Sequence, residues 1–388
     1  MPNLYLSMHL CHEMRAGNRD RLLDVAIKAA PHLKYASISG TDYTMQPLEK
    51  GDWSDAIKPL DEGDFPVEEF VMAMQKINFS SKMFLHTYGI KQDPLDHLSR
   101  SFSRWSEMVE ATGIELNTQL DLILDNPENV CWDETSETWF ISNLGGEKVT
   151  LEEDKYGWIT RLDKDRKVIS NRWVEGLDAP TGMAAYKNKL YVGDRGVLVE
   201  IDISKGEIIR KITLPGAEFI NDVAVSSSGE VYISDTFGNR IYRLSKRGKV
   251  DVFLENTLLD FPNGLLVDGK NLIVATWGTI INPETFETSK KGTLLRVDLK
   301  SKEITPVGKG KPIANIDGVV KYGEHFYVTD WTGGRLLQVS EEGDVTEVVT
   351  GFNQFADLGI DTERGIVVIP EMSKNRFITV NLKALEKP

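Results

Sequence analysis

The pattern of hydrophobic and polar positions changes near residue 113. Before that point, three short apolar runs alternate with stretches whose apolar residues recur at helical spacing. The runs predict strands over Leu4–Leu10, Tyr35–Ser39 and Met83–Tyr88. The stretches predict helices over Asn18–Ala30, Val67–Ile77 and Pro94–Glu110. Alternating strands and helices of this length indicate three βα units with a parallel sheet, too few for a closed eight-fold barrel.

From about residue 114, short β runs separated by Gly, Asn and Asp form a pattern that occurs six times. Each repeat opens on a polar residue, here called its head, and continues after 10 or 11 residues with a strand such as YISD or YVTD. The heads are Glu128, Thr181, Asn221, Asn263, Asp317 and Asp357, at spacings of 53, 40, 42, 54 and 40 residues. Four strands per repeat predict an all-β six-bladed propeller over 114–388, preceded by an α/β segment over 1–113.

The last repeat lacks a fourth strand of its own, because only LKALEKP follows its third strand, FITVN. An unpaired outer edge would invite association with other chains. The run from Ile114 to Leu124 precedes the first head and has no other assignment. We therefore expect residues 114–124 to supply the outer strand of the last blade and to close the ring.

Composition narrows the classes of partner. The 388 residues include 45 Lys and Arg against 59 Asp and Glu, a net charge of −14, which disfavours nucleic acid and anionic membranes as partners. Two cysteines 120 positions apart, Cys11 and Cys131, cannot form a disulfide scaffold or a thiolate zinc site. No leader pattern is visible, so we expect a cytoplasmic protein with a small-molecule substrate. A periplasmic or secreted location is the alternative if the N-terminus is truncated.

The heads carry the candidate chemistry. One Asn or Asp before a strand is most simply a turn residue. The first strand of each propeller blade is innermost, however, so six heads converge on one axis, where three carboxylates and two amides would repel unless a positive charge lies between them. Oxygen ligands favour calcium, with magnesium, zinc and manganese as alternatives. We expect Glu128, Asn263 and Asp317 to bind this divalent cation, with Asn221 beside it.

The propeller resembles the gluconolactonase, or senescence-marker-protein (regucalcin), family over residues 114–388. The motifs that carry the resemblance are PENVCWD at 127–133, NDVAVSSSGEVYISDT at 221–236, FPNGLLVDGKNLIVAT at 261–276 and IDGVVKYGEHFYVTDW at 316–331. The resemblance implies metal binding by Glu128, Asn263 and Asp317, with Asn221 at metal and substrate. The usual Glu-Gly pair of the family reads Glu128-Asn129 here, and no substrate-binding arginine can be assigned.

The activity implied by the resemblance is metal-dependent hydrolysis of a sugar-derived lactone or related ester, within carbohydrate metabolism. The cation would polarise the carbonyl while a carboxylate activates water. Five of six histidines precede the propeller and His325 falls in an inter-strand turn, so we expect Asp317, or else Asp357, to be the base. Asn221 and Thr181 are expected to contact the substrate. Strand alternation predicts that Asp222 points away from the axis.

The N-terminal segment resembles the last three strands of the sugar phosphate isomerase/epimerase (xylose-isomerase-like) TIM barrels. The motifs are LYLSMHLCHE at 4–13, KYASISGTD at 34–42, IKPLDEGDF at 57–65 and KMFLHTYGI at 82–90. His9 and His12 on one strand would face opposite sides and could not chelate together, and His86 replaces a Glu of that family. We expect a non-catalytic remnant or docking module, through which the chain could form a homo-oligomer; a truncated piece of a longer product is the alternative.

Two other functions remain open on the sequence. A binding or scaffold propeller of the NHL-like kind would hold a structural cation in its channel, and an open coordination site facing a pocket would distinguish the enzyme from it. A sugar isomerase with an incomplete barrel would need a complete metal-binding set within residues 1–113, and the sequence offers none there.

Overall fold

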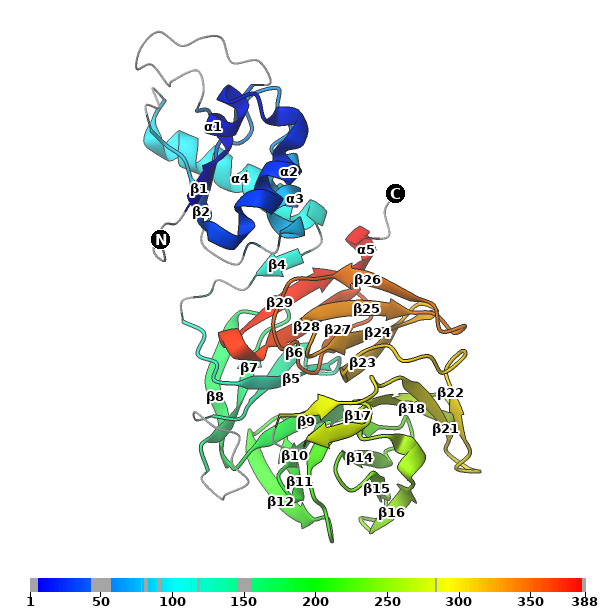
Figure 1. Cartoon of the computed structure of the whole chain (residues 1–388). Helices are drawn as coiled ribbons and strands as arrows, with labels where there is room; N and C mark the ends of the chain where they lie inside the picture. The colour runs from blue at the N-terminus through cyan, green and yellow to red at the C-terminus, as the bar shows by residue number, and fades with distance from the viewer. Residues whose placement is uncertain are drawn as a thin grey trace. The chain divides into compact units, whose positions relative to one another are not determined.

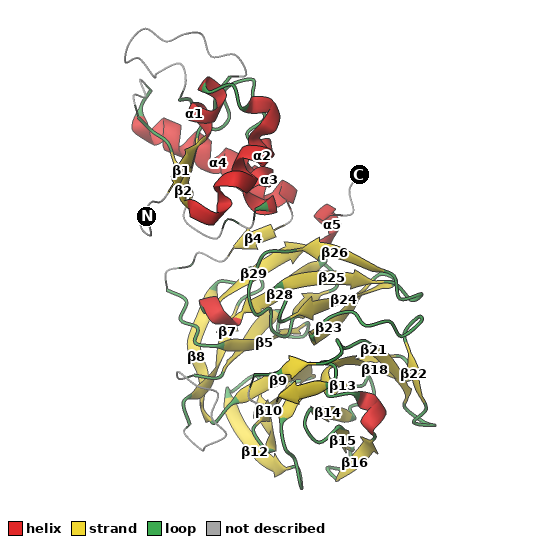
Figure 2. Cartoon of the chain, in the orientation of Figure 1, coloured by secondary structure: helices red, strands yellow, loops and turns green. Residues whose placement is uncertain are grey.

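The computed structural model describes residues 6–42, 57–77, 79, 83–88, 92–112, 114–116, 119, 121–145, 155–282 and 285–385. The chain divides into two compact units, Met1–Ile114 and Glu115–Pro388. Helices gather in the first unit and strands build the second (Figure 2). Among the described residues, no helix combines the length and the apolarity needed to cross a lipid bilayer.

The N-terminal unit contains a three-stranded parallel sheet in the order β1-β2-β3, with Ala36 paired to Met8 on one side and to Met83 on the other. Its strands are β1 (Leu6–His9), β2 (Leu33–Ile38) and β3 (Met83–Leu85). Its helices are α1 (Leu10–Arg15), α2 (Leu22–Ala29), α3 (Glu68–Lys76) and α4 (Pro94–Thr112), with 3₁₀ turns at Arg19–Arg21 and Ala30–His32. The predicted parallel βα elements are therefore confirmed, whereas the resemblance to isomerase barrels stays a prediction.

Helix α1 is the element of this unit that the apolar pattern did not predict. The expected strand Leu4–Leu10 ends at His9, and residues 4 and 5 lie outside the described part of the chain. Leu10, Cys11 and Met14 are buried at helical spacing, and Leu10 and Met14 join a core that contains Phe70. The apolar residues just after His9 thus follow a helical period.

The second unit is a propeller of six four-stranded antiparallel sheets, which confirms the predicted fold class. Its inner strands lie near the middle of the ring and its outer strands at the periphery (Figure 1). The first three blades are β5 (Pro127–Asp133), β6 (Thr138–Asn143), β7 (Gly157–Leu162) and β8 (Val168–Leu177); β9 (Pro180–Tyr186), β10 (Lys189–Asp194), β11 (Val197–Asp202) and β12 (Glu207–Thr213); and β13 (Ile220–Val225), β14 (Val231–Asp235), β15 (Arg240–Leu244) and β16 (Val250–Glu255).

The remaining three blades depart from the repeat at two places: the fourth blade has an added hairpin, and the sixth blade takes its fourth strand from before the first blade. Their strands are β17 (Pro262–Asp268), β18 (Asn271–Thr276), β21 (Leu294–Asp298) and β22 (Ile304–Pro306); β23 (Ile316–Tyr322), β24 (His325–Asp330), β25 (Arg335–Val339) and β26 (Val345–Val349); and β27 (Gly359–Asp361), β28 (Ile366–Glu371), β29 (Arg376–Asn381) and β4 (Ile114–Leu116). The fourth blade contains an extra hairpin of β19 (Ile280–Asn282) and β20 (Glu287–Thr288). Short helical segments lie at Thr257–Leu259, Met372–Lys374 and α5 (Leu382–Leu385).

The last blade takes its fourth strand from the segment that precedes the first blade, because β4 is hydrogen-bonded to β29. Only Ile114–Leu116 of the expected run is a strand; residues 121–124 are not, and 117, 118 and 120 lie outside the described residues. The inner strands of the first and last blades also meet directly. Val130 N donates to Asp357 O, and Asp357 N donates to Glu128 O. The ring is therefore closed both at its periphery and at its axis.

Apolar side chains between neighbouring blades form the core. Phe140 and Ile159 of the first blade pack with Leu190 and Val199 of the second, and all four are fully buried. Every residue of β6 is buried, because a middle strand is covered on both faces by the adjacent blades. The sequence of the middle strands is accordingly rich in Val, Ile and aromatic residues.

Candidate functional site

In the first five blades the head residue lies at a β-bulge in the innermost strand, whereas Asp357 of the sixth blade precedes its inner strand β27. In the third blade, Ile220 pairs with Asp235 but Val223 pairs with Ile233, so three steps on the inner strand match two on its partner. The first, second, fourth and fifth blades show the same shift. One extra residue allows two consecutive side chains to reach the same side of the strand. The bulge thus brings the head and the residue after it to the axis.

Hydroxyl groups on the second strands stabilise these bulges. Ser142 Oγ accepts from Asn129 N at 3.0 Å, and Ser234 Oγ accepts from Asp222 N at 2.8 Å. Thr329 Oγ1 accepts from Gly318 N at 2.9 Å. The Ser or Thr that recurs in motifs such as YISD and YVTD therefore pairs a backbone N–H that the bulge removes from the ladder.

The residue after the head supplies functional groups that the sequence argument missed. Asp222 does not point away from the axis, as alternation predicted; it is 4% exposed and hydrogen-bonded to the Asp357 carboxyl of the sixth blade. The third and sixth blades are opposite in a six-membered ring, so this contact crosses the axis. Asn129 Nδ2 donates to Asp357 Oδ2 at 2.7 Å. The sequence signal for the bulge would have been an inner strand that is one residue longer than the part of the second strand with which it pairs.

Space at the axis explains why glycine follows three of the six heads. A Cβ on Gly182 would overlap Asp222 Oδ1, and a Cβ on Gly318 would overlap Asp357 Oδ1. At Gly264 the obstacle would be backbone of the next inner strand. The carboxyl groups of Asp222 and Asp357 therefore occupy space that a side chain at Gly182 or Gly318 would fill.

The four axial carboxyls, on Glu128, Asp222, Asp317 and Asp357, are all buried, and no Lys, Arg or His among the described residues forms an ion pair with them. Burial, followed by Asp317 and Asp222, raises the pKa of Glu128 well above its usual range. Burial also raises the pKa of Asp357, to which the other three carboxyls add. The pKa of Asp222 rises to about 6 and that of Asp317 to about 7, in both cases mainly through burial. Among the described residues, the charged groups that shift these pKa values are carboxyls alone.

Carboxylates elsewhere in the blades differ, because those that end the second strands have cationic partners. Asp330 Oδ2 lies 2.6 Å from Arg335 Nη2, and Glu371 Oε2 lies 2.6 Å from Arg376 Nε. In each case the arginine follows the acid by five positions, at the start of the third strand. The axial carboxyls are thus a separate set, distinguished by the absence of such a partner among the described residues.

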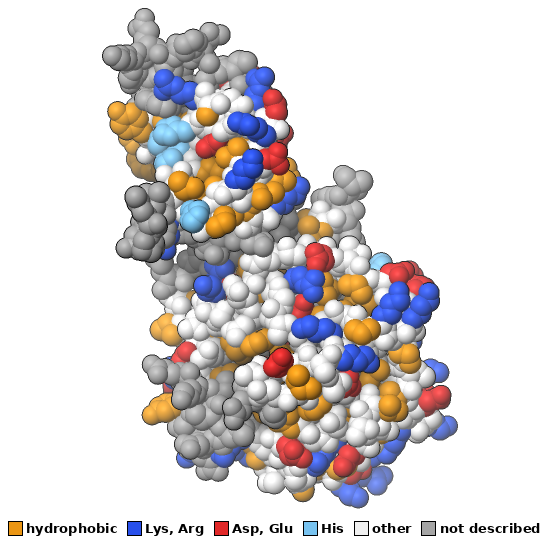
Figure 3. Space-filling view, in the orientation of Figure 1, with side chains coloured by type: hydrophobic (Ala, Val, Ile, Leu, Met, Phe, Trp, Pro, Cys, Tyr) orange, Lys and Arg blue, Asp and Glu red, His pale blue; other side chains and the backbone are white. Residues whose placement is uncertain are grey.

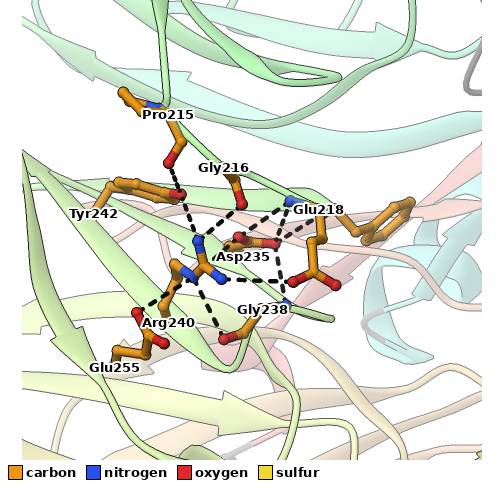
Figure 4. Close-up of polar contacts among 9 residues, drawn as sticks. Pro215, Gly216, Glu218, Asp235, Gly238, Arg240, Tyr242 and Glu255 are labelled. Atoms are coloured by element: carbon orange, nitrogen blue, oxygen red, sulfur yellow. Dashed lines mark hydrogen bonds and ion pairs between the residues drawn. The ribbon is translucent and has the colours of Figure 1, made fainter.

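The strand-end acid also fixes the loop that leads to the head of its own blade, as Asp235 shows (Figure 4). Asp235 Oδ1 accepts from Glu218 N at 3.1 Å and from Phe219 N at 2.8 Å, two residues before Asn221. Arg240 Nε lies 3.6 Å from Asp235 Oδ2, and Arg240 Nη1 donates to Gly216 O at 2.8 Å. The loop before Asn221 is consequently held by hydrogen bonds to the fully buried Asp235 carboxyl.

Four buried oxygens at the axis accept no hydrogen bond: Glu128 Oε2 and the Oδ1 atoms of Asn129, Asn221 and Asn263. The side-chain amide nitrogen of each asparagine donates a hydrogen bond: Asn129 to Asp357, Asn221 to Thr236 Oγ1 at 3.2 Å, and Asn263 to Asp317 Oδ1 at 2.7 Å. Each carbonyl oxygen therefore has a fixed direction. Buried acceptors without donors are costly, and a bound cation would satisfy several at once. Glu128, Asn263, Asp317 and Asn221 fit a hard divalent ion on this ground.

The other predicted site residues lie at the axis with different contacts. Thr181 Oγ1 is directed at backbone carbonyls, 3.3 Å from both Gly193 O and Ile220 O. Asp357 Oδ1 accepts from Leu358 N at 2.8 Å, so both of its oxygens are engaged. His325 opens strand β24, eight residues beyond its head.

In the N-terminal unit the expectation that His9 and His12 face opposite sides is wrong. Because β1 ends at His9 and α1 begins at Leu10, the two rings lie 4.9 Å apart, with His86 at 5.5 and 6.2 Å. Histidine side chains gather on the visible face of this unit (Figure 3). Ser37 Oγ lies 2.6 Å from His9 Nδ1. Across the described ranges, however, no three or more His, Cys, Asp or Glu side chains are arranged to hold a metal ion.

Comparison with known proteins supports the propeller fold. No family model and no curated protein matches this sequence. Among solved structures, a gluconolactonase from Xanthomonas campestris is 16% identical with a TM-score of 0.50, over 67% of this chain and 87% of that chain. A catalytically inactive virginiamycin B lyase from Staphylococcus aureus with quinupristin is 14% identical with a TM-score of 0.47, over 69% and 98%. At 16% identity, the likeness to the gluconolactonase shows a shared propeller fold.

Proposed function

We propose that the propeller is a hydrolase of a lactone or related ester, a sugar-derived lactone being the first class to test, and that its activity depends on a divalent cation. The observation that carries the proposal is the set of buried acceptor oxygens beside carboxyls that have no cationic partner among the described residues. The shared fold with a gluconolactonase supports sugar lactones as the first substrates to test, while the chemistry itself is argued from the site residues.

The residues that would hold the cation are Glu128, Asn263, Asp317 and Asn221, with calcium the first choice for an all-oxygen set. When bound, a divalent cation supplies Lewis-acid polarisation of a carbonyl group. The asparagine amides keep their carbonyl oxygens in fixed directions, and the Asp222–Asp357 contact across the axis keeps the blades at a fixed separation.

Asp317 is the residue best suited to accept a proton from water. Its Oδ1 accepts from Asn263, and its Oδ2 has no hydrogen-bond donor among the described residues. Burial raises the pKa of Asp317 to about 7 in the cation-free protein, and a bound cation would lower it, so the choice of Asp317 as the base rests on its Oδ2 atom. Asp357 is the weaker choice, because Asn129 and Leu358 occupy its two oxygens.

A second candidate is a non-catalytic scaffold propeller of the NHL-like kind, and the burial of the heads favours it. Glu128, Asn263 and Asp317 are 6%, 2% and 5% exposed, as expected for a cation that only holds the ring together. In that case the cation would raise stability without giving turnover.

The deciding experiment measures hydrolysis of a panel of sugar lactones with calcium, zinc or manganese by wild type, by Asp317→Asn and by Asp251→Asn, a carboxylate on outer strand β16 that serves as the control. We expect cation-dependent turnover in wild type and the control, and a loss of at least about 100-fold in Asp317→Asn. If a cation raises the melting temperature but no lactone is hydrolysed, the result would favour the scaffold function over the hydrolase function.

A further inference from the structure

Six aromatic rings lie together at the end of the ring where the inner strands begin. They are Phe219, Phe237, Phe261, Trp277, Phe286 and Trp331, here called the aromatic rim. Phe219 and Phe261 precede the heads Asn221 and Asn263 by two residues. Phe237, Trp277 and Trp331 follow the second strands of the third, fourth and fifth blades. The rim therefore belongs to the third, fourth and fifth blades, which also carry Asn221, Asn263 and Asp317.

The rings form one continuous set. Phe237 lies 5.3 Å from Phe219 and is stacked on Phe286 at 5.9 Å. Trp277 lies 5.7 Å from Phe286 and 5.5 Å from Trp331. Trp277 is buried, but the other members keep part of their surface exposed. An apolar surface shared by three blades thus lies just beyond the candidate site.

Two members of the rim have strained backbone. Phe261 has φ 62° and Phe286 has φ 55°, in the left-handed region that bulky residues rarely adopt. Such conformations are energetically unfavourable and concentrate at functional sites. Phe286 also lies in the loop of the β19–β20 hairpin, the element that the other blades lack among their described residues, and Trp277 Nε1 donates to Phe286 O at 3.2 Å. The fourth blade thus uses an added hairpin and strained backbone to bring one ring into the rim.

Polar groups around the rim are already paired within the protein. Thr236 Oγ1 donates to Pro262 O at 2.8 Å, and Thr279 Oγ1 donates to Asp260 Oδ1 at 2.9 Å. Asn315 Nδ2 donates to Trp277 O at 2.8 Å, while the ammonium of Lys291 donates to Asn315 Oδ1. A polyhydroxylated ligand would find few free partners here, whereas a flat apolar group could cover the exposed ring surface.

We propose that the aromatic rim is a specificity subsite and that the substrate is a lactone or ester with an aromatic or other flat apolar group, rather than a bare sugar lactone. This inference rests on the proposed hydrolase function. The apolar group lies on Phe237, Phe286 and Trp331, and the reacting carbonyl extends toward Asn221, Asn263 and Asp317. Removal of one ring lowers transition-state and ground-state binding of the apolar group alike.

The test compares dihydrocoumarin, an aryl-fused δ-lactone, with glucono-δ-lactone in wild type, Phe286→Ala and Phe352→Ala. Phe352 is the matched control, because it stacks on Phe355 at 4.8 Å at the same end of the ring but in the loop before the sixth blade. Phe286→Ala should lower kcat/KM for dihydrocoumarin by about 10-fold or more and for the sugar lactone by less than about 3-fold. Circular dichroism checks that both variants fold.

A second readout needs no turnover. The lactam analogue of dihydrocoumarin should quench the fluorescence of Trp277 and Trp331 in wild type and bind about 10-fold more weakly to Phe286→Ala. If the sugar lactone is the better substrate, or if Phe286→Ala lowers both activities equally, the inference is overturned while the hydrolase stands. If no lactone is hydrolysed, the hydrolase fails; lactam binding that depends on Phe286 then still supports an apolar subsite, and its absence overturns that as well.

Discussion

The cation-free propeller should become less stable as pH rises from about 4 to about 8. Asp317 has an ordinary pKa of 3.8 in the unfolded chain and a pKa of about 7 in the folded one. Between these values the folded state binds more protons than the unfolded state, so the free energy of unfolding falls as pH increases. The contribution of Asp317 is fully present below its unfolded pKa and is lost by the time pH passes its folded pKa.

The magnitude follows from the size of the shift. Three pKa units correspond to about 4 kcal/mol, and Asp222, whose pKa rises from 3.8 to about 6, would lose about 3 kcal/mol if it titrated alone. The two groups are coupled through the axis, so their contributions do not simply add. For a unit of this size, 4 kcal/mol is roughly 10 °C in melting temperature.

The assay is thermal unfolding in the presence of a chelator at pH 5 and pH 8, with Asp317→Asn and the outer-strand control Asp251→Asn alongside. Between pH 5 and pH 8 Asp317 alone loses about 2.7 kcal/mol, so wild type and the control should melt roughly 7 °C or more lower at pH 8. Asp317→Asn should show a smaller difference, because it removes one of the four axial carboxyls whose pKa is raised. Added calcium should raise the melting temperature more at pH 8 than at pH 5, because ionised carboxylates bind it. A chelated wild type that is equally stable at both pH values, or more stable at pH 8, would refute the reasoning.

Two further substitutions test the architecture that supports the axis. Gly318→Ala should lower the free energy of unfolding by about 3 kcal/mol or more, because its Cβ would overlap Asp357 Oδ1, whereas Gly196→Ala, with no atom near its Cβ, should leave urea unfolding unchanged. Equal stability of the two variants would contradict the crowded axis. Asp235→Ala should cost about 2–4 kcal/mol, because the N–H groups of Glu218 and Phe219 lose their acceptor and Arg240 loses its buried carboxylate partner while keeping Gly216 O. It should also weaken calcium binding measured by calorimetry; an unchanged calcium affinity would show that the loop does not position Asn221.

The repeat pattern predicted most of the fold because each blade satisfies the same local requirements. The middle strands are buried on both faces, so their apolar runs stand out, and the polar heads recur at nearly constant distance from them. The six blades follow from this repeat, and the parallel elements of the N-terminal unit follow from the alternation of strand and helix patterns before it. Helix α1 escaped notice because Leu10, Cys11 and Met14 continue an apolar run already assigned to a strand.

The site was predicted less completely, because strand alternation breaks down at the bulges. The heads Glu128, Asn263 and Asp317 do converge with unsatisfied oxygens among them, but the cation and the base remain proposals. Asp222 and Asn129 were missed, since an alternating strand would have directed them outward. Trp277 and Trp331 follow second strands and can be expected near the channel mouth from the sequence, but Phe286 could not be placed beside them, because it reaches the rim through a hairpin that interrupts the repeat.

Closure of the last blade by β4 has a consequence for the order of folding. Asn126 N donates to Asn375 Oδ1, and Asn129 is joined to Asp357 across 228 positions of sequence, so the contacts that complete the ring are among the least local in the chain. Contacts of high sequence separation form slowly, because the intervening loop must be closed before they contribute. During synthesis, residues 114–116 must wait for the third strand of the sixth blade, and the first five blades can form before it. Glu128 and Asp357 meet only at that final step, so cation affinity should develop late in refolding and report the moment at which the ring closes.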